Sequence, residues 1–192
     1  MLIKSKANDK VAALLTRNVN QEPRAAAGGV FTVVCLDAEG RVKWEAESHN
    51  LVVNQGLQDM NTKYFTGSGY TATWYIGLYG AASSNNPTAS DTAALHPGFT
   101  EITPYSNATR PACTFGTATT ADPSVITNSL SVASFNINAG ATVGGAFLIS
   151  DNTKGGSAGV LFSAADFASP GDRAVVSGDV IQVTYTFSLD AI

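Results

Sequence analysis

The segment from Asp179 to Ser188 alternates between two kinds of side chain, and this pattern constrains the fold more than any other feature. One side carries Val180, Gln182, Thr184 and Thr186, and the other carries Ile181, Val183, Tyr185 and Phe187. A period of two is typical of a β-strand, whose successive side chains point to opposite faces of a sheet. The pattern predicts a long strand in an antiparallel sheet with one buried face.

Shorter strand-like runs recur along the chain and are separated by turn residues at intervals of roughly ten residues. We predict further strands at 30–36, 41–49, 73–79, 112–118, 130–137, 143–149 and 159–163. The turn Asp37-Ala38-Glu39-Gly40 makes a hairpin of the first two. The fold class that follows is all-β, an antiparallel β-sandwich. A jelly-roll-like topology is preferred, and an immunoglobulin-like one stays open.

One segment departs from the strand pattern. Leu57, Met60 and Tyr64 follow helical spacing. We predict a single short helix at about 54–64, capped by Asn54 and ended by the glycines at 67 and 69. This helix is expected to close one end of the sandwich.

Residues 1–28 are predicted to form an N-terminal arm, followed by a single domain at 29–192. Val11, Ala12, Leu14 and Leu15 give the arm a short helical periodicity, and a helix of one or two turns needs a partner to fold against. The run Ala25–Gly29 is interpreted as a flexible hinge.

Charge is unevenly distributed between the two parts. The arm carries five basic residues (Lys4, Lys6, Lys10, Arg17 and Arg24) and two acidic ones, a formal charge of +3. The remainder carries six basic and thirteen acidic residues, a formal charge of −7. The net charge of −4 argues against nucleic acid as the main partner, because binding to phosphates needs clustered lysine and arginine.

Other features concern the surface and the compartment. Charged residues make up only 14% of the chain, against about 25% in typical soluble domains, which suits a surface covered by neighbours. No apolar stretch reaches the roughly 20 residues of a membrane span, and the N-terminus lacks a signal-peptide core. We therefore expect a protein without a membrane partner that is made in the cytoplasm.

The sequence offers no recognisable chemistry. His49 and His96 each lack a neighbouring ligand at metal-site spacing, and 151–156 resembles a turn more than a calcium loop. Cys35 lies in an apolar strand, so a buried free thiol is expected, with a disulfide to Cys113 as the alternative. We assign no catalytic, cofactor-binding or metal-binding residue and expect a protein that is not an enzyme.

The two tryptophans have two interpretations. Trp44 and Trp74 both lie in predicted strands and are expected to be core residues. The alternative is an exposed platform of a carbohydrate-binding module.

A family resemblance is carried by several runs in a fixed order along residues 30–188. These runs are Trp44 with His49–Leu57, Thr73–Tyr79, Asp91–Ala93, His96–Glu101, Arg110-Pro111, Gly145–Leu148 and Gly178–Thr186. In this order they resemble small structural proteins of tailed bacteriophages, similar to the jelly-roll cement or decoration proteins of phage capsids. No single run is specific to that family.

The resemblance implies a place on the capsid exterior of a virion assembled in the host cytoplasm. The implied partners are the major capsid protein and neighbouring copies of the chain, as a homo-oligomer on the particle. The residues proposed to bind these partners lie in the arm: Lys4, Lys6, Lys10, Leu14, Leu15, Arg17 and Arg24. No cofactor is implied.

Two other functions compete with this one. A tail or fibre protein could bind a host receptor through the polar loop 81–90 and the tyrosines Tyr70, Tyr75 and Tyr79. A hydrolase of the cell wall or capsule would need a cluster of carboxylates or histidines, which the sequence does not indicate.

Overall fold

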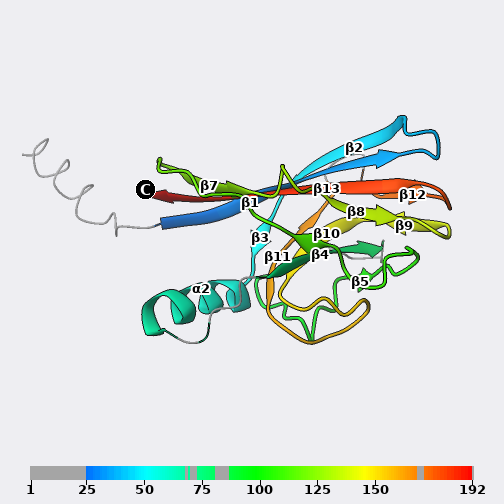
Figure 1. Cartoon of the computed structure of the whole chain (residues 1–192). Coiled ribbons are helices and arrows are strands. Elements are labelled where there is room, and N and C mark those ends of the chain that lie inside the picture. Colours follow the sequence, from blue (N-terminus) through cyan, green and yellow to red (C-terminus); the bar gives the residue numbers. More distant parts are fainter. Residues whose placement is uncertain (1–24, 68, 70–72, 81–86, 168–170, 192) are drawn as a thin grey trace, which may run out of the picture.

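A computed structural model describes residues 25–67, 69, 73–80, 87–167 and 171–191. Within this part of the chain the predicted all-β sandwich is confirmed: two antiparallel sheets pack face to face, with one helix at one end (Figure 1). The helical periodicity at 11–15, the arm residues of the sequence analysis and Tyr70 lie outside the described residues.

The first sheet has the order β2-β1-β13-β7, and β8 is a further partner of β13. Its strands are β1 (Ala25–Leu36), β2 (Val42–His49), β7 (Ser124–Thr127), β8 (Ala133–Asn136) and β13 (Val180–Ala191). The first and last strands pair along their whole length, from Leu36 opposite Val180 to Ala25 opposite Ala191. The two ends of the described chain therefore lie side by side.

The second sheet has the order β3-β11-β10-β4-β5, and β6 is a further partner of β4. Its strands are β3 (Leu51–Val52), β4 (Trp74–Gly80), β5 (Thr100–Glu101), β6 (Ala112–Cys113), β10 (Gly145–Ile149) and β11 (Leu161–Asp166). A separate pair joins β9 (Ala141–Val143) to β12 (Arg173–Val175).

The hinge interpretation of residues 25–29 is wrong. These residues form the first part of β1 and pair with β13 from Ala191 to Phe187. Alanine and glycine are poor strand formers when isolated. Here the pairing with a strand more than 150 residues away in sequence supplies the backbone hydrogen bonds, so residues 25–29 are part of the first sheet.

Three predicted strands have different limits in the structure. The strand expected at 112–118 is only Ala112–Cys113, and the one expected at 130–137 is only Ala133–Asn136, with Leu130 97% exposed. The segment 143–149 divides between β9 and β10 at Gly144. In the first two cases apolar side chains such as Phe115 and Leu130 extend beyond the residues that find a pairing partner.

The main core lies between the sheets. Phe31 and Val33 of β1 and Ile181, Val183 and Tyr185 of β13 are fully buried on the inner face of the first sheet. They belong to the same cluster as Ile76, Leu78, Ala146, Leu148 and Phe162 of the second sheet. The alternation that predicts β13 thus separates core residues from half-exposed ones.

The outer face of the second sheet is also buried. Tyr79, Phe147, Ile149 and Leu161 pack with Ala93 and Phe99 from the segment before β5. Tyr79 is fully buried and its ring lies 4.7 Å from that of Phe99, so its expected place in an exposed recognition tip is wrong. Tyr75 is half-buried against the same cluster.

Two glycines of the second sheet make room for aromatic rings on the neighbouring strand. Gly77 faces Phe147 and Gly145 faces Tyr79 across the β4–β10 pair. A Cβ atom on either glycine would lie 2.1 Å from the facing ring. Gly77 of the Thr73–Tyr79 run and Gly145 of the Gly145–Leu148 run are therefore packing residues.

Helix α2 (Asn54–Thr66) closes one end of the sandwich as predicted and ends at Gly67, which has a φ of 70°. The expected cap at Asn54 is wrong: Val53 is the N-cap and makes no side-chain capping bond. Backbone carbonyls fill that role, since Val53 N donates to Phe162 O and Asn54 N to Ala89 O. Gly56 lets the helix approach β11, because a Cβ there would lie 2.4 Å from Phe162 O.

Candidate partner-binding groove

The α2 end of the sandwich contains a cavity of about 1150 Å³ between the helix and the edges of both sheets. Its lining includes Leu189 near the end of β13, which pairs with Ala27 near the start of β1. These two strand ends lie side by side in Figure 1. We call this cavity the aromatic groove. It is lined by Asp59, Met60, Asn61, Lys63, Tyr64, Phe65, Thr73, Trp74, Ala112, Cys113, Thr114, Phe115, Gly116, Ile126, Leu148, Phe162, Tyr185, Phe187 and Leu189.

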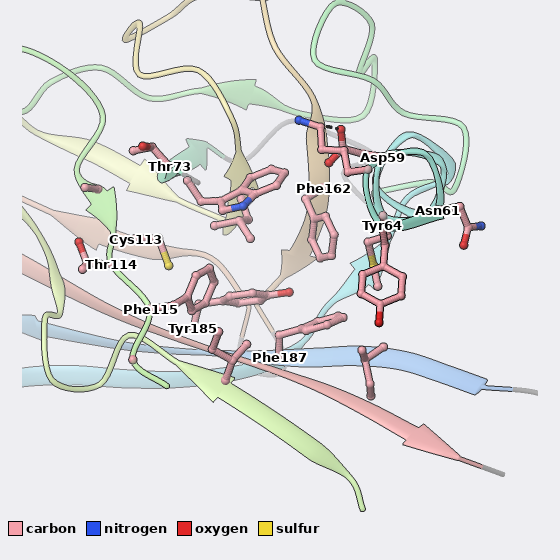
Figure 2. A pocket seen from close by; sticks show the side chains of 18 of the residues that line it. Asp59, Asn61, Tyr64, Thr73, Cys113, Thr114, Phe115, Phe162, Tyr185 and Phe187 are labelled. Carbon is pink, nitrogen blue, oxygen red and sulfur yellow. Dashed lines mark ion pairs between the residues drawn. The ribbon is translucent and has the colours of Figure 1, made fainter. Parts of the chain in front are cut away.

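Aromatic rings from both sheets form the interior of the groove. Figure 2 shows Phe115, Tyr185 and Phe187 on one side and Phe162 opposite them. The Phe162 ring meets those of Trp74 and Phe187 edge-on, each at 5.4 Å between centroids. Such edge-to-face contacts hold rings in fixed positions. The interior is therefore a preformed apolar surface.

Exposed apolar side chains extend this surface at its mouth. Tyr64 and Phe65 at the end of α2 are 84% and 76% exposed and pack edge to face on each other, at 4.9 Å. Leu189 near the end of β13 is 38% exposed. Contiguous exposed apolar surface of this kind marks a site where another molecule or segment binds.

The buried hydroxyl of Tyr185 in the groove already has hydrogen-bond partners. The Tyr185 hydroxyl accepts hydrogen bonds from Asn50 Nδ2 at 2.8 Å and Ser163 Oγ at 3.2 Å. At the rim, Lys63 Nζ lies 3.5 Å from Asp59 Oδ1, the pair that Figure 2 marks with a dashed line. The groove thus offers rings and aliphatic groups to a ligand, which favours an apolar occupant.

The thiols have no features of a reactive site. Cys113 lines the groove, and burial raises its pKa to about 12. Burial also raises the pKa of Cys35 to about 11. Both cysteines are buried and free, which confirms the thiol predicted at Cys35. Since the thiolate is the nucleophilic form, neither group is activated at neutral pH.

A second cluster of polar side chains lies at the other end of the second sheet. Arg110 is 1% exposed and donates two hydrogen bonds to Glu101, Nε to Oε1 at 2.9 Å and Nη2 to Oε2 at 2.7 Å. It also donates to the carbonyls of Asp151 and Gly156 at 2.9 and 2.7 Å. The bonds of this cluster join β5, the segment that carries Arg110 and the 151–156 turn to one another, so its role is structural.

The histidines belong to neither cluster, whereas the predicted 151–156 turn contributes the Asp151 and Gly156 carbonyls to the Arg110 cluster. His49 is exposed on β2. His96 stacks on Phe99 at 4.3 Å, and its Nδ1 lies 2.9 Å from the Phe99 carbonyl oxygen. Asp151 caps the 151–156 turn by accepting a bond from Thr153 N at 2.9 Å. Across the described ranges, no group of three or more His, Cys, Asp or Glu side chains is placed to hold a metal ion.

The tryptophans lie in different places. Trp74 is half-buried in the aromatic groove, and Trp44 is half-buried on β2, edge-on to Phe167 at 5.9 Å. Of the polar loop 81–90, the structure describes residues 87–90, where Thr88 donates to the buried Asp91 carboxylate.

The carboxyl group of Asp166 gives a pH-dependent prediction. Burial raises its pKa, and the negative charge of Asp172 raises it further. A hydrogen bond from the Tyr79 hydroxyl at 3.3 Å lowers the pKa and partly offsets these effects. Because the pKa of Asp166 is higher in the folded than in the unfolded state, the contribution of this carboxyl group to stability is fully present below about pH 4. It is lost as the pH rises through the folded-state pKa. Asp166→Asn should therefore stabilise the protein more at pH 7 than at pH 3.5, by about 0.5 kcal/mol or less after screening.

Chemical denaturation of both proteins at the two pH values measures this difference. Glu45→Gln, on the exposed side of β2, serves as a control for removing a negative charge. An equal gain at both pH values would contradict the assignment of the effect to the Asp166 carboxyl.

The sequence analysis did not find the aromatic groove. Its members come from six strands, the helix, the residue before β4 and the segment after β6, and only the neighbouring aromatic residues Tyr64 and Phe65 at the helix end hinted at exposed apolar surface.

No protein-family model matches the chain, and no curated protein is significantly similar to it. Within the described residues, no helix has the length and apolar character needed to cross a membrane.

Proposed function

We propose that the protein is a structural component of a tailed-bacteriophage particle, a cement or decoration protein that binds the outer surface of the major capsid shell. The observation that carries the proposal is the aromatic groove, a preformed apolar surface with exposed rings at its mouth. The resemblance in sequence supplies the biological setting, and the capsid protein and neighbouring copies are the proposed partners.

The places of the motifs in the fold support a structural role. Asn50 bonds the buried Tyr185, Gly56 admits β11, Gly77 faces Phe147, and Arg110 joins two loops. Each of these residues serves packing or connection within the domain. Motifs that specify a rigid scaffold are expected in a protein whose task is to hold neighbours together.

The first test is the number of copies per purified virion, measured by quantitative mass spectrometry against the major capsid protein. A cement protein should be present in an amount comparable with that of the capsid protein. A much smaller number would move the protein to the tail or a fibre and make the 81–90 loop the segment to mutate. Absence from the particle would overturn the proposal.

The second test concerns the surface. Tyr64→Ala/Phe65→Ala should weaken binding to capsids that lack the protein, because tyrosine is enriched among the few interface residues whose truncation costs more than about 1 kcal/mol. Leu130→Ala, which removes a 97% exposed side chain outside the groove, should bind normally. Equal binding by all three proteins would show that the groove is not the docking surface.

A further inference from the structure

We infer that in the free protein the apolar part of the chain's own N-terminal arm, Val11 to Leu15, binds in the aromatic groove and covers it. The inference is independent of the proposed role in a virion, because it concerns the protein before any partner is bound. Three observations carry it: the chemistry of the groove, the place where the arm meets the domain, and the pattern of the arm.

The groove fits a peptide segment better than a small molecule. Its volume of about 1150 Å³ lies above the range of roughly 300–1,000 Å³ that is usual for small-ligand pockets. Its polar groups at Tyr185 are already bonded within the protein, and the mouth is formed by exposed Tyr64, Phe65 and Leu189. Amphipathic helices bind grooves of this kind through apolar residues at positions i, i+3 and i+4.

The arm joins the domain at the mouth of the groove. Ala27 of β1 is paired with Leu189, which lines the groove, and Ala25 is paired with Ala191 two residues farther on. Nine residues lie between Leu15 and Ala25, a reach of up to about 35 Å. Helix α2 has 13 residues and is about 20 Å long, so the arm can reach every part of the groove.

The arm carries the matching pattern. Val11, Leu14 and Leu15 have the spacing i, i+3 and i+4 and would share one face of a short helix. The arm's formal charge of +3 also complements the −7 of the remaining chain. A segment attached through a short linker has an effective concentration of about a millimolar, which favours the chain's own groove over that of a second copy.

The test uses the full-length chain with Trp44→Phe, which leaves Trp74 in the groove as the single tryptophan. In this background, Leu14→Asp/Leu15→Asp is compared with Asn18→Asp/Asn20→Asp, which adds the same charge to the arm without removing apolar groups. Leu14→Met/Leu15→Met is the conservative variant. Quenching of Trp74 fluorescence by acrylamide, which is uncharged, reports the accessibility of the groove.

We expect the quenching constant to rise about twofold in the Leu→Asp variant, because the uncovered indole becomes accessible to solvent. It should stay unchanged in the Asn→Asp and Leu→Met variants. Backbone amide exchange at 59–65 should increase in the Leu→Asp variant alone. Equal quenching in all variants would overturn the inference. Light scattering should show a monomer; a dimer that the Leu→Asp change dissociates would overturn docking within one chain and assign the arm to a second copy.

Discussion

Replacing Arg110 by methionine is expected to lower the free energy of unfolding by about 3–5 kcal/mol, because the change leaves a buried carboxylate without its partner. The two side chains are 1% and 8% exposed, and Glu101 also accepts a bond from Gly155 N at 2.8 Å. The carbonyls of Asp151 and Gly156 lose their donor as well. Chemical denaturation at pH 7 measures the loss.

Two further variants separate the lost charge pairing from other effects. Arg110→Met/Glu101→Gln should recover part of the stability, since no uncompensated charge stays buried. Arg41→Met removes an arginine that is 73% exposed and bound to Asp37 and Glu39, so it should cost less than about 1 kcal/mol. If the double variant were as unstable as Arg110→Met, the loss would not come from an unpaired Glu101.

Replacing Asn128 by alanine is expected to cost about 2–4 kcal/mol, because buried backbone groups would lose their only side-chain partner. Asn128 is fully buried at the point where β13 changes its partner from β8 to β7. Its Oδ1 accepts from Tyr185 N at 2.7 Å, and its Nδ2 donates to Val183 O at 3.3 Å. The amide thus continues the sheet's hydrogen bonding across the gap between the two short strands.

Asn107 provides the matched control. Its amide also bonds the backbone of β8, to Ser134 O at 3.0 Å and from Asn136 N at 3.1 Å, but it is only half-buried. Water can replace these bonds, so Asn107→Ala should cost about 1 kcal/mol. Equal losses in both alanine variants, measured by thermal and chemical unfolding, would mean that burial of the Asn128 amide has no special effect.

Several elements could be predicted because their signals are local. The alternation in β13, the turn between β1 and β2, and the helical spacing ended by Gly67 each depend on residues close together in sequence. Periodicity shows which side chains must be buried, and nearly every strand arrangement open to this sequence would bury the same side chains. The fold class therefore followed from the sequence.

Other features depended on partners far away in the chain. Residues 25–29 become a strand only because β13 lies beside them, and the start of α2 is capped by the carbonyls of Phe162 and Ala89 in place of the Asn54 side chain. Tyr79 is buried because Ala93 and Phe99 cover the outer face of the second sheet. No local pattern distinguishes a covered face from an exposed one.

The sequence by itself determined a β-sandwich with one closing helix and a basic arm ahead of an acidic domain. Only the tertiary structure decided the strand order, the burial of Arg110 and Asn128, and the position of the aromatic groove. The physical reason is that periodicity encodes which face of an element is apolar, whereas a groove forms where elements distant in sequence leave their apolar faces incompletely covered. Phe162, Phe187 and Tyr64 meet at one such place because the start of β11 lies there together with the ends of β13 and α2.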